Sequence, residues 1–91
     1  PARHRVLRGG REIRLSPTEF RLLEFLMRRA GGVIRRGTII EAVWDRDQGI
    51  EDNTLDAFVR LLRTKVDRNF HPKLIHTVRG VGYTVRDERE Q

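Results

Sequence analysis

The stretch HTVRGVGYTV, residues 76 to 85, places one arginine and two glycines between strand-forming residues. Valine, threonine and tyrosine favour extended backbone, and glycine accepts the positive φ angles of tight turns. We therefore expect strands at residues 74 to 78 and 83 to 86, joined by a turn at residues 79 to 82. An arginine on this turn would project beyond the domain, where it could meet a phosphate backbone or a minor groove. The alternative interpretation is plain turn chemistry for both glycines.

The segment before this hairpin predicts the longest helix of the chain. It begins at about Asn53, a good N-cap residue, and ends at about Arg68, with Asn69 and Pro72 as stop signals. One side of this helix is apolar and is expected to pack on the core: Leu55, Phe58, Val59, Leu62 and Val66.

The opposite face of the same helix is narrow and carries small or donor-bearing side chains: Asn53, Ala57, Arg60 and Thr64, with Asp56 and Leu61 at its edges. Small side chains permit close approach to a major groove, and Asn and Arg can bond base edges or phosphates. The alternative is that the charges pair along the helix, Asp56 with Arg60 and Arg63 with Asp67.

Earlier segments predict a hairpin and two further helices. Residues 5 to 15 alternate apolar and charged positions around Gly9 and Gly10, which is typical of a short hairpin. Ser16 and Glu19 form a capping box pattern that opens a helix, with Pro17 at its first position and glycines at 31 and 32 ending it. Residues 36 to 44 form a shorter amphipathic helix, and residues 45 to 52 an acidic loop.

Composition predicts one small basic domain spanning residues 1 to 91. The chain has 91 residues, 37% of them hydrophobic, a net charge of +6 and no cysteine, so neither disulfides nor thiolate zinc sites hold it together. Its first 35 residues carry nine bases against three acids, whereas residues 36 to 52 carry two against five. This division suggests a polyanion for the basic faces and a protein partner for the acidic one, or simply a charged, solvated surface.

Several partners and activities are not expected. No apolar run approaches a membrane span of roughly 20 residues, and no signal peptide opens the chain, so we expect a soluble cytoplasmic protein. Ser16, the single serine, is better used as a cap, and His4, His71 and His76 lack the spacing of a helical metal pair. We expect no catalytic residue, no metal, no cofactor and no enzyme activity.

Three blocks of sequence, at their spacings, resemble the effector domain of OmpR/PhoB-family two-component response regulators: LSPTEFRLLEFLMRRAGGVIRRGTIIEAVW, DNTLDAFVRLLRTKV and LIHTVRGVGYTV. The resemblance covers about residues 5 to 86. It implies an α+β winged helix-turn-helix, with three helices, a short N-terminal hairpin and a C-terminal hairpin as the wing. It also implies that the receiver domain and the first strands of the effector domain are missing from this chain, which begins without methionine.

The resemblance further implies sequence-specific binding of double-stranded DNA at direct repeats, as a head-to-tail dimer, for transcriptional regulation. Helix 53 to 68 would lie in the major groove and wing 79 to 82 in the minor groove. The implied DNA contacts are Asn53, Thr54, Asp56, Ala57, Arg60, Leu61, Arg63 and Thr64 from the helix, Thr77, Arg79, Gly82 and Tyr83 from the wing, and Arg36 and Trp44 at the backbone.

Two protein partners are implied as well. Residues Asp45, Arg46, Asp47, Gln48, Gly49 and Ile50 match the loop that contacts RNA polymerase in this family, and a cognate histidine kinase would act through the receiver domain. Asn53 and Leu61 stand where some relatives place arginine, so the operator cannot be borrowed from them, and Leu61 suits a thymine methyl. The alternative function is a winged-helix protein-interaction module without sequence-specific DNA binding.

Overall fold

The computed structural model describes residues 5 to 44 and 50 to 87 of the chain. The elements follow one another in this order: β1 (Arg5–Arg8), β2 (Arg11–Arg14), α1 (Pro17–Arg28), β3 (Val33–Arg35), α2 (Arg36–Val43), α3 (Asp52–Val66), β4 (Ile75–Val78) and β5 (Gly82–Val85). The predicted architecture of three helices between two hairpins is confirmed. A short strand, β3, is an addition that the sequence analysis missed.

The start of the chain folds as its local sequence predicts. Strands β1 and β2 pair antiparallel, with Arg8 opposite Arg11 at the turn. Ser16 then caps α1: its hydroxyl accepts from the Glu19 amide at 3.1 Å, while the Glu19 carboxylate accepts from the Ser16 amide at 2.7 Å. Both halves of the predicted capping box are present, and Pro17 occupies the first turn.

Strand β3 adds a third member to the C-terminal sheet, whose order is β3-β5-β4. Ile34 pairs with Tyr83 across β3 and β5, and its side chain is buried while Val33 and Arg35 are exposed. A three-residue strand gives almost no sequence signal, because two alternations cannot be separated from a loop. Its pairing with β5 stabilises it.

The two wing glycines serve different purposes. Gly80 has a φ of 75°, the positive value expected for the turn, and Val81 N–H closes that turn on Val78 C=O at 3.0 Å. Gly82 is already part of β5, so the turn is one residue shorter than predicted. A Cβ at Gly82 would lie 2.0 Å from the Ile34 carbonyl oxygen, so this glycine is needed because β3 approaches so closely.

Helix α3 begins earlier than predicted. Its first residue is Asp52 and its N-cap is Glu51, which makes no side-chain capping bond. The prediction of Asn53 as N-cap is therefore wrong, and Asn53 is an exposed residue of the first turn instead. The helix ends at Val66, two residues before the predicted end.

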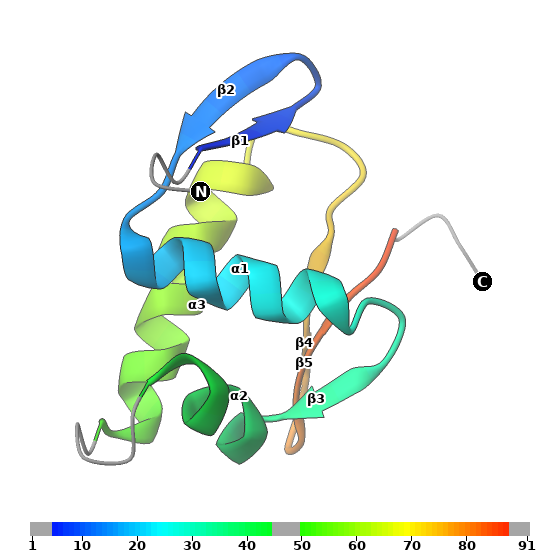
Figure 1. Cartoon of the computed structure of the whole chain (residues 1–91). Helices are drawn as coiled ribbons and strands as arrows, with labels where there is room; N and C mark the ends of the chain where they lie inside the picture. Colours follow the sequence, from blue (N-terminus) through cyan, green and yellow to red (C-terminus); the bar gives the residue numbers. More distant parts are fainter. Residues whose placement is uncertain (1–4, 45–49, 88–91) are drawn as a thin grey trace.

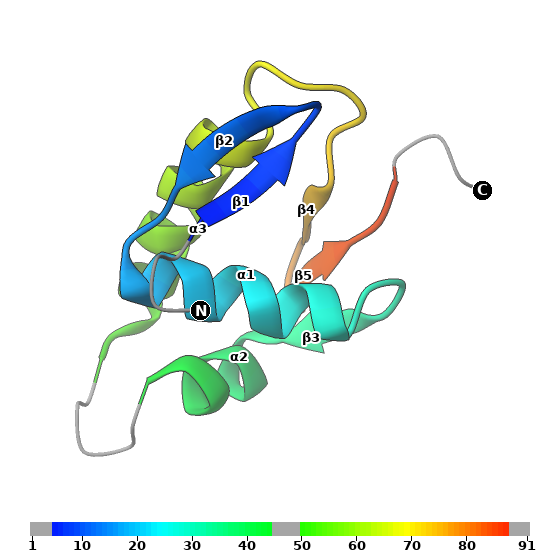
Figure 2. The same cartoon turned by 45° about the horizontal axis from the view of Figure 1, so that its top comes forward.

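The core lies where α1, α2, α3 and the C-terminal sheet meet. Its fully buried side chains come from all three helices: Leu22, Leu26, Ile39, Leu55, Val59 and Leu62. In Figure 1 the N-terminal hairpin lies beside the C-terminal end of α3, whereas α2 and the turn between β4 and β5 lie at the opposite end of the molecule. Figure 2 shows α1 between the hairpin and α2. No described helix is long and apolar enough to cross a membrane.

Candidate nucleic-acid interface

Helix α3 presents the two faces that its sequence predicts. Leu55, Val59 and Leu62 are completely buried, and Phe58 packs against the same core. The other face is exposed to solvent at Asn53, Ala57, Arg60, Leu61 and Thr64. Leu61 is half exposed, so its apolar side chain is accessible on this face.

Asp56 is tied to two elements outside α3. Arg36, the first residue of α2, donates to both carboxylate oxygens, with Nη1–Oδ1 at 2.6 Å and Nη2–Oδ2 at 3.1 Å. The Tyr83 hydroxyl, from β5, donates to Oδ1 as well. This cluster of Arg36, Asp56 and Tyr83 joins α2, α3 and the wing at one place.

The same cluster shifts the pKa of each of its members. The hydrogen bonds from Arg36 and then from Tyr83 hold the pKa of Asp56 below its ordinary value. The bond to Asp56 raises the pKa of Arg36, while burial and the bond to Asp56 raise the pKa of Tyr83. At neutral pH Asp56 is therefore a carboxylate that only accepts hydrogen bonds.

Arg63 connects α3 to the other wing strand. Its Nε donates to the Ile75 carbonyl at 3.3 Å and its Nη2 to the Thr77 hydroxyl at 2.5 Å, while the guanidinium carbon lies 5.6 Å from the centre of the Tyr83 ring. The pairing of Arg63 with Asp67 that we considered does not form between these described residues. The hydrogen bond between Arg63 and Thr77 therefore orients the wing relative to α3.

Two arginines of the expected interface have no hydrogen-bond or ion-pair partner among the described residues. Among the described residues, the guanidinium groups of Arg60 and Arg79 form no hydrogen bond or ion pair. Both side chains are exposed, Arg60 on α3 and Arg79 in the wing turn. They are available to phosphate oxygens in a way that Arg36 and Arg63 are not.

The remaining expected contacts differ in accessibility. Thr54 is half-buried, and the Thr64 hydroxyl bonds to the Arg60 carbonyl within the helix at 3.0 Å. Gly82 is buried. Trp44 is only 7% exposed and packs edge-on against Phe58, with ring centres 5.4 Å apart, so it is mainly a core residue.

The expected polymerase loop lies mostly outside the described residues. Of positions 45 to 50, only Ile50 is described, and it is a half-buried residue that packs against the core. In the described part of the chain, no three His, Cys, Asp or Glu side chains gather into a possible metal site.

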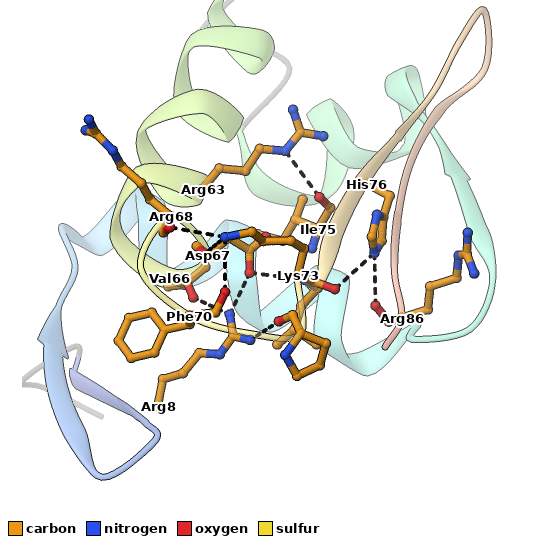
Figure 3. A network of polar contacts seen from close by, with 12 residues as sticks. Arg8, Arg63, Val66, Asp67, Arg68, Phe70, Lys73, Ile75, His76 and Arg86 are labelled. Carbon is orange, nitrogen blue, oxygen red and sulfur yellow. Dashed lines mark hydrogen bonds and ion pairs between the residues drawn. The ribbon is translucent and has the colours of Figure 1, made fainter. Parts of the chain in front are cut away.

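The C-terminal end of α3 is held by charged groups that the sequence analysis did not identify (Figure 3). Asp67 is 4% exposed and accepts from Arg8 Nη1 at 2.6 Å and from the amides of Leu74 and Ile75 at 3.1 and 2.9 Å. Arg8 also donates to the carbonyl of Val66. No local signal predicts this contact, since Arg8 and Asp67 lie in different parts of the sequence.

Lys73 also stabilises this end of the helix. Its ammonium group donates to the carbonyls of Asp67, Arg68 and Phe70 at 2.6, 3.1 and 3.0 Å. Carbonyl groups that follow a helix have no intrahelical partner, and a cation there also complements the helix dipole. Arg8 and Lys73 together fix the direction of α3 relative to the N-terminal hairpin and the sheet.

Comparisons with known proteins point to one family. The family model described as "Transcriptional regulatory protein, C terminal" matches residues 10 to 85. The chain is 44% identical over 88 residues to the transcriptional regulatory protein PcoR of Escherichia coli, covering 97% of this chain and 39% of PcoR. It is 46% identical over 82 residues to the phosphate regulon regulator PhoB of Rhizobium meliloti (strain 1021), covering 90% of this chain and 36% of that protein.

A solved structure extends the likeness to a protein seen with DNA. The DNA-binding domain of the response regulator AdeR, in complex with an intercistronic region, superposes with a TM-score of 0.79 at 25% identity, covering 92% of this chain and 85% of AdeR's. The chain spans under two fifths of the length of the curated relatives it matches.

Proposed function

This chain belongs to the C-terminal DNA-binding domains of OmpR/PhoB-type two-component response regulators, a family of non-enzymatic transcription regulators, and we propose that it reads a specific operator with α3 and the wing. Helix α3 enters the major groove, and Arg79 reaches the adjacent minor groove or its backbone. Two copies bind direct repeats head to tail.

The observation that carries this proposal is that hydrogen bonds join α3 to the wing and to α2. Asp56 accepts two hydrogen bonds from Arg36 of α2 and one from Tyr83 of β5, and Arg63 donates one to Thr77 of β4. These four hydrogen bonds hold α2, α3 and the wing strands together. Preorganised contacts cost less conformational entropy on binding than contacts that must first be ordered. Arg60 on the exposed face of α3 and Arg79 in the wing turn add two exposed cations from the joined elements, which suits a polyanion.

Individual residues take different parts in the proposed complex. Arg60 and Arg79 supply most of the electrostatic affinity, because each neutralises phosphate charge and releases counterions. Asn53, Ala57 and Leu61 face base edges, with Leu61 against a thymine methyl. Arg36, Arg63 and Thr77 act mainly by holding this surface in place, and Thr54, Thr64, Trp44, Gly82 and Tyr83 border it.

We propose that the whole protein works as other regulators of this type do. Residues 45 to 50 would contact RNA polymerase, and a cognate histidine kinase would act through a receiver domain. The setting for these contacts is the cytoplasm, where the chromosome is found.

Selection from a randomised pool of double-stranded DNA tests this function. The domain is bound to the pool at near-physiological salt, and the retained sequences are read. We expect enrichment of two direct repeats about one helical turn apart. Retention without any enriched sequence would contradict the proposal and favour a protein-interaction module whose basic surface only attracts polyanions.

A further inference from the structure

Asp56 is the one acidic residue between positions 53 and 66, on a helix proposed to face DNA. A carboxylate in this place would repel phosphates unless a cation neutralised it or a base donated a hydrogen bond to it. The bidentate bond from Arg36 supplies the neutralising charge, yet 43% of the Asp56 side chain remains exposed. This exposure leaves part of the side chain accessible to a ligand, at the edge of the α3 face that is proposed to meet bases.

Hydrogen-bond capacity shows what is left for a ligand. An ionised carboxylate has about four acceptor sites, two on each oxygen. Oδ1 accepts from Arg36 and from Tyr83, whereas Oδ2 accepts only from the second Arg36 nitrogen. In the described part of the chain no further side chain donates to Asp56, so one site on Oδ2 remains open.

We infer that Asp56 reads the exocyclic amino group of a cytosine through this open site on Oδ2, with Arg36 and Tyr83 as its positioning residues. This inference rests on the proposed function. In the major groove only cytosine N4 and adenine N6 donate hydrogen bonds. Adenine also presents the N7 acceptor beside its amino group, which would face the carboxylate unfavourably, whereas cytosine presents a C–H there. Guanine and thymine offer only acceptors to this site.

The test uses the operator obtained by selection and a cytosine analogue, 2-pyrimidinone, which lacks the 4-amino group. Each operator cytosine is replaced in turn, and the affinity of each duplex is measured for the parent domain and for Asp56→Ala. We expect one position per repeat at which the analogue weakens parent binding by about tenfold. At that position Asp56→Ala, which has no side-chain acceptor and binds more weakly overall, loses less than twofold further.

Matched variants separate reading from structural damage. Arg60→Ala loses affinity through a phosphate contact and keeps the full tenfold effect of the analogue. Tyr83→Phe retains the carboxylate and both Arg36 bonds but loses one positioning bond, so the analogue still weakens its binding at the same position, by less than in the parent. Thermal unfolding of each variant establishes that the domain is folded at the temperature of the binding measurements.

The outcomes distinguish this inference from the proposed function. If no operator is selected, the proposed function fails first. If an operator is bound but every analogue weakens the parent and Asp56→Ala equally, Asp56 reads no cytosine and the inference is wrong. A coupling found only at an adenine, tested with purine in its place, would also overturn the choice of cytosine.

Discussion

Arg8 at the end of β1 forms a 2.6 Å ion pair with Asp67, 59 positions later, at the C-terminal end of α3. Both side chains are nearly buried, with 12% and 6% of their surface exposed. The pair therefore fastens the N-terminal hairpin to the helix proposed to read DNA. Lys73 binds three carbonyls at the same end, so the helix is held by cations from two directions.

Replacing Arg8 should destabilise the fold strongly. Arg8→Ala leaves Asp67 buried with only its two backbone donors, and we expect the free energy of unfolding to fall by about 2 to 4 kcal/mol. Arg14→Ala, on the same hairpin, removes an exposed pair with Glu12 at 3.4 Å and should cost less than about 0.5 kcal/mol. Urea unfolding measures both, and equal losses would contradict a specific role for Arg8.

Gly82 should tolerate no side chain. Gly82→Ala places a Cβ against the Ile34 carbonyl, so β3 must move away from β5, and we expect a loss of about 2 to 4 kcal/mol. Gly37 is the matched control, because it lies in the first turn of α2 with open space around its Cβ position. Gly37→Ala should leave thermal stability unchanged or raise it by up to about 1 kcal/mol. A stable Gly82→Ala domain would show that the approach of β3 is not required.

Glu19 should make stability depend on acid pH. Burial of Glu19 disfavours its charge, but the bonds from Lys65 at 2.6 Å and from Ser16 outweigh it and hold its pKa below the ordinary 4.5. A carboxylate whose pKa is lower when folded stabilises the fold above its unfolded pKa, and this contribution is lost as the pH falls through the folded pKa. The stability advantage of the parent over Glu19→Gln should thus shrink from pH 6 to pH 3.

Unfolding of both proteins by denaturant across that pH range measures the difference. Lys65→Met provides a second comparison, since it removes the main partner of Glu19 and should weaken the same dependence. A difference between parent and Glu19→Gln that stays constant with pH would mean that the capping geometry alone, and not the charge, stabilises α1.

Arg79 should contribute to DNA binding out of proportion to its charge. Arg79→Ala should weaken operator binding by about 1 to 3 kcal/mol, because the wing turn holds its uncommitted guanidinium at the end of the domain. Arg86→Ala removes the same charge from an exposed position beyond the other end of β5 and should have a much smaller effect. Fluorescence anisotropy at two salt concentrations measures the operator affinity of both variants. Equal losses of affinity would mean that Arg79 contributes only its charge and makes no specific contact from the wing.

Arg60 and Arg63 should differ in kind although they lie three residues apart on α3. Arg60→Ala should leave thermal stability unchanged and reduce the salt dependence of DNA binding by about one phosphate contact. Arg63→Ala should lower stability, because Thr77 and the Ile75 carbonyl lose their donor. If Arg63→Ala were as stable as the parent, the connection between α3 and β4 would not depend on this side chain.

Sequence reasoning succeeded where the cause is local. The Ser16 and Glu19 box, the turn at Gly80 and the two faces of α3 each depend on residues within a few positions of one another. It failed where the cause is distant in sequence. Strand β3 exists through its pairing with β5, and the need for glycine at Gly82 arises from the Ile34 carbonyl.

The candidate site shows the same division. Asp56 and Arg63 were expected to face DNA or to pair within the helix, whereas their partners come from α2, β4 and β5. The alternation of charges cannot reveal such partners, because side chains brought together by folding leave no period in the sequence. The exposed positions of Arg60 and Arg79, by contrast, follow directly from helical spacing and turn geometry.

The most direct test of specific reading is the ratio of two affinities at near-physiological salt, one for the selected operator and one for a scrambled duplex of equal length and composition. If α3 and the wing read base sequence, the operator should bind at least about a thousandfold more tightly. A ratio near one, with both affinities falling steeply as salt rises, would contradict the account, because it would leave only the attraction of a basic domain to phosphates.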